Sequence, residues 1–239
     1  MSFIITLYVR EGIVMASDSR LALNKSVQQG EQTVLHVSVG LSDSNYKTFL
    51  APGNIGISTF GEAAIQGVPI AGFVESFINE RLRGKSLSVH DAAKALLDYF
   101  CKFPGPPETG FHVAGYETRD GKGSAQVWRV LVRAGQAVQV NAKDIQGAAW
   151  DGEGDIVHRL INPVWVKDPA GNYQQLPGFD IPWQFFTLQE AIDFATFAIR
   201  ATTDAIRFQA RPKTVGGPID VLVIKPDGAF WVQRKELHA

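Results

Sequence analysis

The order in which strand-like and helix-like segments follow one another is the feature that most constrains the fold of this chain. Apolar alternation and runs of β-branched and aromatic residues predict strands at residues 3–9, 13–16, 33–39, 47–50, 55–59, 111–117, 125–132, 137–141, 219–225 and 229–232. Periodicity near 3.6 predicts helices at residues 61–82, 88–103, 156–160 and 187–208. The helices come in pairs between blocks of strands, which argues against a Rossmann or barrel winding with one helix after every strand.

This order favours an α+β fold, a four-layer α/β/β/α sandwich in which two antiparallel sheets lie face to face and helices cover their outer surfaces. In the first helical segment, Pro69 either introduces a kink or marks the effective start of the helix. The chain has 239 residues without an evident linker or internal repeat, so we expect a single domain over residues 1–239.

Composition and charge exclude several classes of protein. The formal net charge is −1 and no run of basic residues occurs, so we expect no nucleic-acid partner. No stretch approaches the ~18–20 apolar residues of a membrane span, and the N-terminus lacks the basic segment of a signal peptide. The single cysteine, Cys101, excludes an intramolecular disulfide, and its place in the helical run 92–103 predicts a buried structural thiol. We therefore expect a cytoplasmic protein with no membrane partner.

Neither a metal site nor a cofactor motif is visible in the sequence. The glycines around Glu153 lack the length and the Lys-Ser/Thr ending of a phosphate-binding loop, and no Gly-x-Ser-x-Gly motif occurs. The histidines show no close metal-ligand spacing: His36, His90, His112, His158 and His238. We expect neither a cofactor nor a metal.

The N-terminal segment holds residues whose types and spacing indicate chemistry. Ser2 precedes the first predicted strand, and the opening hairpin ends in the sequence Ala16-Ser17-Asp18-Ser19-Arg20. Lys47 then precedes a strand, a turn and a second strand that leads to Gly61. This arrangement resembles the proteasome β-subunits and the related bacterial peptidases of the N-terminal-nucleophile hydrolase superfamily. The resemblance covers roughly the first quarter of the chain and returns at residues 215–220.

The resemblance implies that Ser2 is the catalytic nucleophile once Met1 has been removed, with Asp18, Lys47 and Gly61 as the other catalytic residues. A serine hydroxyl is a weak nucleophile until a base takes its proton, and the α-amine of the same residue has a reference pKa of about 7.7–8. Lys47 would lower the pKa of that amine by like-charge repulsion, and Asp18 would hold Lys47 as its ion-pair partner. The backbone N–H of Gly61, at the head of a helix, would stabilise the oxyanion.

Three further residues are expected to support the site. Arg20 is expected to order the neighbouring loop through hydrogen bonds. Glu153 stands where many family members carry the serine of a Gly-Ser-Gly turn, and its carboxylate either holds the α-ammonium charged or points elsewhere as a turn residue. The family's Asp and Ser before the glycine pair at 216–217 are missing, so Asp204 is either their substitute or simply a helix-end residue.

Three functions remain open on these residues. The first is a peptidase that cleaves peptide or protein substrates inside a homo-oligomeric ring, with helix 88–103 as a possible interface. The second is a non-catalytic ring-forming or peptide-binding protein, and a retained Met1 would favour it because it would block the amine. The third is a small-molecule amidase of the same superfamily. The absence of an extension before Ser2 favours a β-type over an α-type subunit, and nothing in the sequence indicates whether an ATPase partner exists.

Overall fold

Ten strands form two five-stranded antiparallel sheets in the computed structural model, which describes residues 2–29, 32–119, 122–142 and 145–236. Met1 and His238 lie outside the described residues. The first sheet has the order β12 (Gly147–Gly152), β1 (Phe3–Val9), β2 (Gly12–Ser17), β15 (Asp220–Lys225) and β16 (Gly228–Gln233). The second has the order β11 (Gln136–Gln139), β10 (Lys122–Leu131), β9 (Thr109–Arg119), β6 (Ile55–Gly61) and β5 (Thr48–Ala51).

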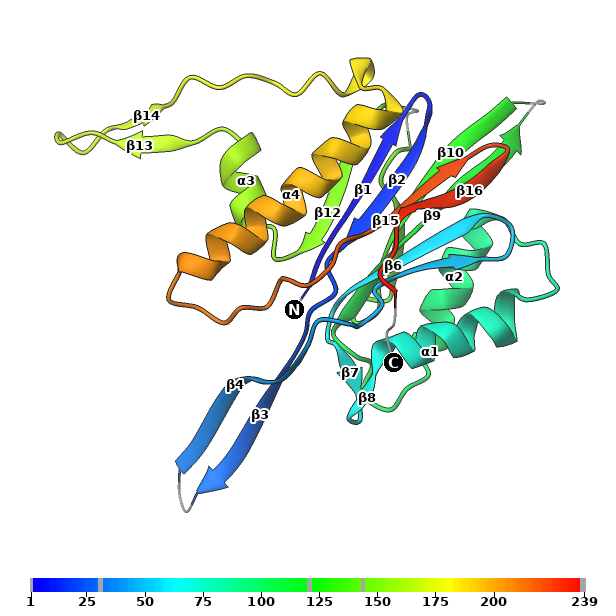
Figure 1. Ribbon diagram of the computed structural model, residues 1–239, viewed down its shortest axis with the longest axis horizontal. Coiled ribbons are helices and arrows are strands. Elements are labelled where there is room, and N and C mark those ends of the chain that lie inside the picture. Colours follow the sequence, from blue (N-terminus) through cyan, green and yellow to red (C-terminus); the bar gives the residue numbers. More distant parts are fainter. Residues whose placement is uncertain (1, 30–31, 120–121, 143–144, 237–239) are drawn as a thin grey trace.

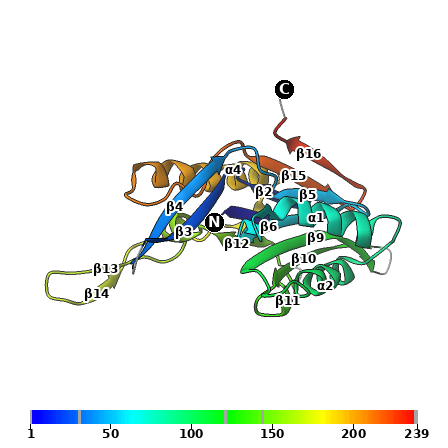
Figure 2. The same cartoon turned by 90° about the horizontal axis from the view of Figure 1, so that it is seen from below.

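Helices cover the outer face of each sheet (Figures 1 and 2). On the first sheet lie α3 (Asp155–Ile161) and α4 (Leu188–Phe208), and a capping box between Thr187 and Glu190 starts α4. On the second sheet lie α1 (Ile70–Phe77), which continues as a π-helical turn over Ile78–Leu82, and α2 (Val89–Phe100). The Ser88 side chain caps α2 by accepting a hydrogen bond from the Asp91 N–H.

Three layers of side chains join these elements, and the one between the sheets matters most for the site. One apolar cluster packs α3 and α4 on the first sheet, and another packs α1 and α2 on the second. Between the sheets, apolar residues such as Ile13 and Met15 fill the half nearest the β1–β2 turn. The half nearest Ser2 carries buried polar side chains instead, among them Thr6, Ser17 and His112. A polar interior therefore lies directly behind the start of the chain.

Two hairpins extend away from the sandwich (Figure 1). One consists of β3 (Leu21–Gln29) and β4 (Gln32–Ser42), and the other of the short strands β13 (Trp165–Lys167) and β14 (Tyr173–Gln175). A 3₁₀ turn at Trp183–Phe185 leads from the second hairpin back to α4. None of the described helices is long and apolar enough to cross a membrane.

The structure confirms most predicted strands and helices and corrects two interpretations. The helix expected from Gly61 begins only at Ile70, because β7 (Ala64–Ile65) and β8 (Val68–Pro69) form a small hairpin before it. The turn of that hairpin needs positive φ, at 50° for Gln66 and 80° for Gly67, and Pro69 lies at the N-cap of the helix.

Cys101 is exposed rather than buried. The buried side of α2 ends with Phe100, and the next residue lies about 100° further round the helix axis. Its thiol donates weakly to the carbonyl of Val132 across 3.5 Å.

Candidate active site

Ser2 lies just before β1 and is held there by the strand on its other side. Its carbonyl accepts a hydrogen bond from the Glu153 N–H at 2.8 Å, and its residue is only 5% exposed. Gly152 has a φ of +92°, and a Cβ at this position would lie 1.7 Å from the Ser2 carbonyl oxygen. Only glycine allows this approach, so the turn after β12 fixes the position of the chain's start.

Asp18 follows β2 and is fully buried. Its Oδ1 accepts hydrogen bonds from the Phe3 N–H at 3.0 Å and from Lys47 Nζ at 2.6 Å. Its Oδ2 accepts from the backbone N–H groups of Arg20 at 3.2 Å and Gly216 at 3.0 Å. Four donors, three backbone N–H groups and one ammonium, thus converge on this one carboxylate.

Lys47 precedes β5 and is 2% exposed. Burial lowers the pKa of its ammonium below the ordinary 10.5, and the Asp18 carboxylate opposes that effect. Because Lys47 Nζ and the Phe3 N–H share one oxygen of Asp18, the ammonium lies within two hydrogen-bond lengths of the peptide bond between Ser2 and Phe3. The ion pair expected from the sequence is thus present beside the expected nucleophile.

A row of hydroxyl groups holds this ion pair between the sheets. The Thr48 hydroxyl bonds the Ser17 hydroxyl at 2.8 Å and the Ser58 hydroxyl at 2.9 Å. Ser17 and Thr48 are the chain neighbours of Asp18 and Lys47, so this contact fixes β2 against β5 next to the ion pair. Sequence reasoning did not single out these residues, although polar side chains inside apolar strand patterns were a usable signal.

Gly61 and Arg20 are placed differently from the three residues above. Gly61 ends β6 with a φ of +91°, and a Cβ there would lie 2.5 Å from the Glu108 carbonyl oxygen. It does not lie at the head of a helix, so the helix-terminus part of its expected role is wrong. The Arg20 guanidinium binds both carboxylate oxygens of Asp43 at 2.7 Å and reaches the Lys213 carbonyl at 3.4 Å. Arg20 therefore joins two loops beside the site.

Glu153 is buried and its carboxylate is engaged by residues from the segment after α4. Arg211 donates a short charge-assisted hydrogen bond to it, and the Thr214 hydroxyl donates another at 3.1 Å. Arg211 also binds Asp155 at 2.8 Å. The sequence did not reveal this partnership. Asp204 is exposed on α4 and makes no hydrogen bond or ion pair with the other candidate residues, so the structure does not bring it to the site.

A second polar chain crosses between the sheets behind Ser2. His112 Nε2 lies 2.8 Å from Asp151 Oδ2, and its Nδ1 lies 2.9 Å from the Thr6 hydroxyl. Since a carboxylate only accepts, the neutral ring carries its proton on Nε2 and accepts from Thr6 at Nδ1. Burial of Asp151 would raise its pKa, but His112 and Arg129 together bring that pKa below its ordinary 3.8. His112 thus links β9 to β1 and β12.

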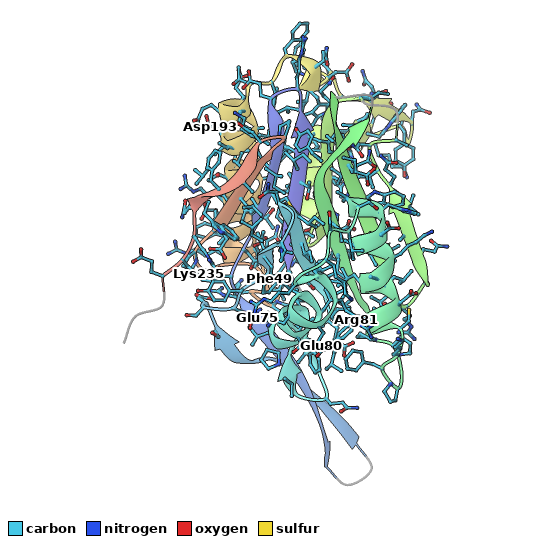
Figure 3. The ribbon with its side chains drawn as sticks, turned by 90° about the vertical axis from the view of Figure 1, so that its right-hand side faces the viewer. Phe49, Glu75, Glu80, Arg81, Asp193 and Lys235 are labelled. Carbon is cyan, nitrogen blue, oxygen red and sulfur yellow. The ribbon has the colours of Figure 1, made fainter. Side chains whose placement is uncertain are left out.

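A second buried ion pair lies next to the first. Lys235, just after β16, makes a short ion pair with Asp220 and lies over the Tyr46 ring, 4.4 Å from its centroid. Asp220 is the cross-strand partner of Ser17, which precedes Asp18. Figure 3 shows Lys235 on the same side of the molecule as Phe49 of β5. The charge of Lys235 also helps to lower the pKa of Lys47.

Comparison with protein-family models and with curated proteins found no match for this chain. Within the described ranges, no group of three or more His, Cys, Asp or Glu side chains is arranged to hold a metal ion. The candidate site therefore stands on its own geometry.

Proposed function

We propose that this chain is an N-terminal-serine hydrolase of the proteasome-like type, which cleaves peptide bonds with the Ser2 hydroxyl after Met1 has been removed. The observation that carries the proposal is the single oxygen of Asp18 that binds both Lys47 Nζ and the N–H of the peptide bond leading from Ser2. A buried ammonium held beside a chain terminus that begins with serine is the arrangement that this chemistry requires.

In the proposed mechanism, the α-amine of Ser2 takes the proton from its own hydroxyl, which then attacks the substrate carbonyl. The positive charge of Lys47 disfavours a second ammonium nearby and keeps the amine neutral, and Asp18 holds Lys47 in place. The Gly61 N–H is the proposed oxyanion donor, acting through its peptide dipole alone. The tetrahedral adduct then breaks its C–N bond, the α-ammonium returns its proton to the leaving amine, and the acyl group remains as an ester on the Ser2 oxygen. Water attacks this ester, releases the second product and restores the hydroxyl.

The contacts of Glu153 support catalysis in this scheme. A free carboxylate next to the α-amine would favour the ammonium form and disable the base. The Glu153 carboxylate is instead bound by Arg211 and Thr214, and Arg211 compensates its charge. In the proposal, Glu153 fixes the Ser2 carbonyl through its backbone N–H. The proposal also includes an N-terminal-nucleophile fold, a homo-oligomeric ring and a cytoplasmic location.

One observation favours a second candidate, a non-catalytic ring-forming or peptide-binding protein. Ser2 is 5% exposed, and neither a cavity of about 400 Å³ nor one of about 270 Å³ is lined by it. Access of substrate to the Ser2 hydroxyl is the property that separates the two candidates.

Intact mass spectrometry before and after treatment with an electrophilic peptide inhibitor tests the proposal. We expect loss of Met1 and one covalent adduct on Ser2, and neither hydrolysis nor adduct in Ser2→Ala. Ser44→Ala, at an exposed position, is the matched control and keeps both. Met1 retained quantitatively in a protein that hydrolyses amides would overturn the mechanism, and a mature N-terminus without an adduct would support the non-catalytic candidate.

A further inference from the structure

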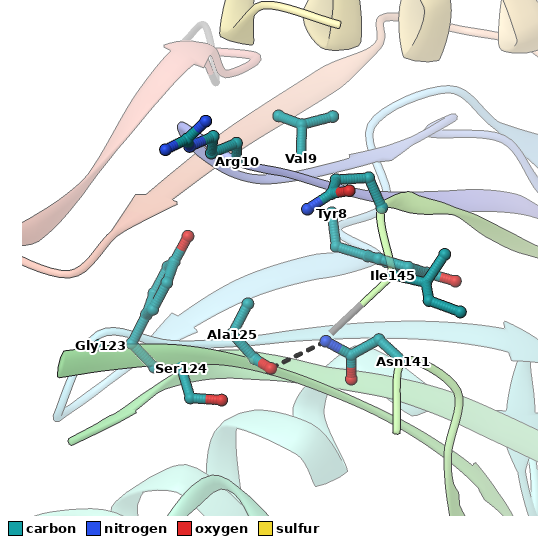
Figure 4. Close-up of a pocket in the computed structure, with 10 residues that line it drawn as sticks. Tyr8, Val9, Arg10, Gly123, Ser124, Ala125, Asn141 and Ile145 are labelled. Atoms are coloured by element: carbon teal, nitrogen blue, oxygen red, sulfur yellow. Dashed lines mark hydrogen bonds between the residues drawn. The ribbon is translucent and has the colours of Figure 1, made fainter. Parts of the chain in front are cut away.

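A cavity of about 400 Å³ opens between the two sheets at the end of the sandwich opposite to Ser2. Tyr8, Val9 and Arg10 at the end of β1 form one wall, and Gly123, Ser124 and Ala125 at the start of β10 form the other (Figure 4). Strand β1 separates the cavity from Ser2 by six residues, or about 20 Å. The cavity is therefore distinct from the proposed hydrolytic site, and its size lies in the range of small-molecule sites.

Two tyrosines supply hydroxyl donors to the cavity. Burial raises the pKa of Tyr8, and it raises the pKa of Tyr116 to about 12. Both phenols therefore keep their protons at neutral pH. In the described part of the chain neither hydroxyl has a hydrogen-bond partner, so both are available to a ligand that accepts hydrogen bonds.

Arg10 adds a permanent positive charge at the rim. No described carboxylate pairs with its guanidinium, and the residues that line the cavity include no Asp or Glu. The adjacent Glu11 is turned away, because its carboxylate accepts a hydrogen bond from the Leu188 N–H at the start of α4, at 2.8 Å. The charge of Arg10 is thus left for an anionic group.

Asn141 and two glycines complete the surroundings of the cavity. The Asn141 side chain binds the backbone of β10 beside the cavity. It accepts a hydrogen bond from the Val127 N–H at 2.9 Å and donates one to the Ala125 carbonyl at 2.8 Å (Figure 4). Gly147 lies against the ring of Tyr8, where a Cβ would be 3.1 Å from the hydroxyl. A Cβ at Gly123 would lie 3.1 Å from Pro226 and 3.4 Å from the Tyr116 ring, so glycine keeps this side open. The tyrosine rings and Ala125 thus offer apolar surface to a planar body.

We propose that this cavity binds a small planar molecule that carries one oxyanion group, a carboxylate or a phosphate. The oxyanion accepts two hydrogen bonds from the guanidinium of Arg10, whose fork matches its geometry, and a further bond from the Tyr116 hydroxyl. The planar body lies against the tyrosine rings and Ala125, where stacking and apolar contact hold it.

Isothermal titration of the full chain with benzoate and with phenyl phosphate tests this proposal, and the two arms show which oxyanion is preferred. We expect saturable binding of at least one anion at one site per chain, and binding of the neutral benzyl alcohol at least about tenfold weaker. Arg10→Gln should weaken the anion by about tenfold or more, and Tyr116→Phe by a smaller factor. Ala125→Leu, which fills the cavity without changing charge, should abolish binding.

Three controls keep the result interpretable. Arg133→Gln removes an exposed arginine from the other end of the second sheet and should leave binding unchanged. Ser2→Ala should also leave it unchanged, so a failure of the proposed hydrolase does not affect this test. Thermal unfolding establishes that each variant is folded, and Arg10→Gln serves where Ala125→Leu does not fold. Absence of saturable binding by both anions, or equal binding by native protein and Arg10→Gln, overturns the proposal.

Discussion

Two buried Lys–Asp pairs lie close together where β2 ends and β15 begins, and only one of them is a candidate for catalysis. Both lysines and both aspartates are almost completely removed from solvent. Burial lowers the pKa of both lysines, and in each case the partner carboxylate opposes it. The chemistry of the two pairs is thus the same. The difference is that Asp18 also binds the peptide bond after Ser2, whereas Asp220 binds the backbone N–H of Lys235 itself.

Burial and a lowered lysine pKa therefore do not by themselves identify a catalytic ion pair. A buried pair is costly to desolvate, and it is found in structural as well as functional positions. What distinguishes Lys47 is its distance from a potential nucleophile. Experiments that measure stability and activity separately therefore test this distinction. We expect substitutions at both pairs to lower stability, and only those at Asp18 and Lys47 to abolish hydrolysis.

The largest effect is expected from Asp18→Asn, which leaves the ammonium of Lys47 buried without its carboxylate. We expect the free energy of unfolding to fall by about 3–5 kcal/mol and hydrolysis to be lost. Asp220→Asn should cost less, because Lys235 keeps its contact with the Tyr46 ring. Urea unfolding and a peptide hydrolysis assay measure both. Loss of activity in a folded Asp220→Asn variant would remove the functional distinction between the pairs.

The reverse order of stability is expected when the lysines are replaced. Asp18 keeps three backbone N–H donors without Lys47, and Asp220 keeps one without Lys235. We therefore expect Lys47→Met to destabilise by about 1–3 kcal/mol and Lys235→Met by more. Only Lys47→Met should abolish hydrolysis. Equal activity of the two variants would show that Lys47 has no role at Ser2.

Asp151 and Arg129 extend the comparison to a pair with one partly exposed partner. The pKa of Asp151 is below its ordinary 3.8 in the folded chain, so its contribution to stability is complete above that value and is lost as the pH falls through the folded-state pKa. We expect Asp151→Asn to reduce the free energy of unfolding by about 1–3 kcal/mol at neutral pH. The difference from native protein should narrow as the pH falls below 3.8 and through the folded-state pKa. A difference independent of pH would contradict the assigned shift.

The smallest effect is expected from Thr48→Val, which removes the hydroxyl between Ser17 and Ser58. We expect a loss of about 1–2 kcal/mol, since two buried hydroxyls lose a partner. If this contact positions the ion pair, Thr48→Val lowers kcat and leaves KM unchanged. Thr48→Ser, which keeps a hydroxyl, then restores both kcat and stability. An unchanged kcat in a destabilised Thr48→Val variant would assign the contact to stability alone.

Local sequence patterns predicted most strands and helices. They failed where pairing with a distant strand or a local turn determines the secondary structure. Strand β12 lies in the sequence Gly-Ala-Ala-Trp-Asp-Gly, which has weak strand propensity and becomes a strand by pairing with β1. The helical pattern after Gly61 was overridden by the turn at Gln66 and Gly67.

The site was predictable only in part for a similar reason. Ser2, Asp18 and Lys47 came from the resemblance, and the structure brings them together. Arg211 at Glu153 and Lys235 at Asp220 are contacts between distant segments, and nothing in the local sequence marks an ordinary lysine or arginine as buried and paired.

The hydrogen bond from Gly216 to Asp18 spans 198 residues, and this separation has a consequence for how the site forms. The closing of such long loops is slow, and chains rich in distant contacts fold slowly. A growing chain carries Ser2, Asp18 and Lys47 early in synthesis, but β12 and the segment before β15 come much later. The geometry at Ser2 is therefore completed only after the segment that contains Gly216 has been synthesised.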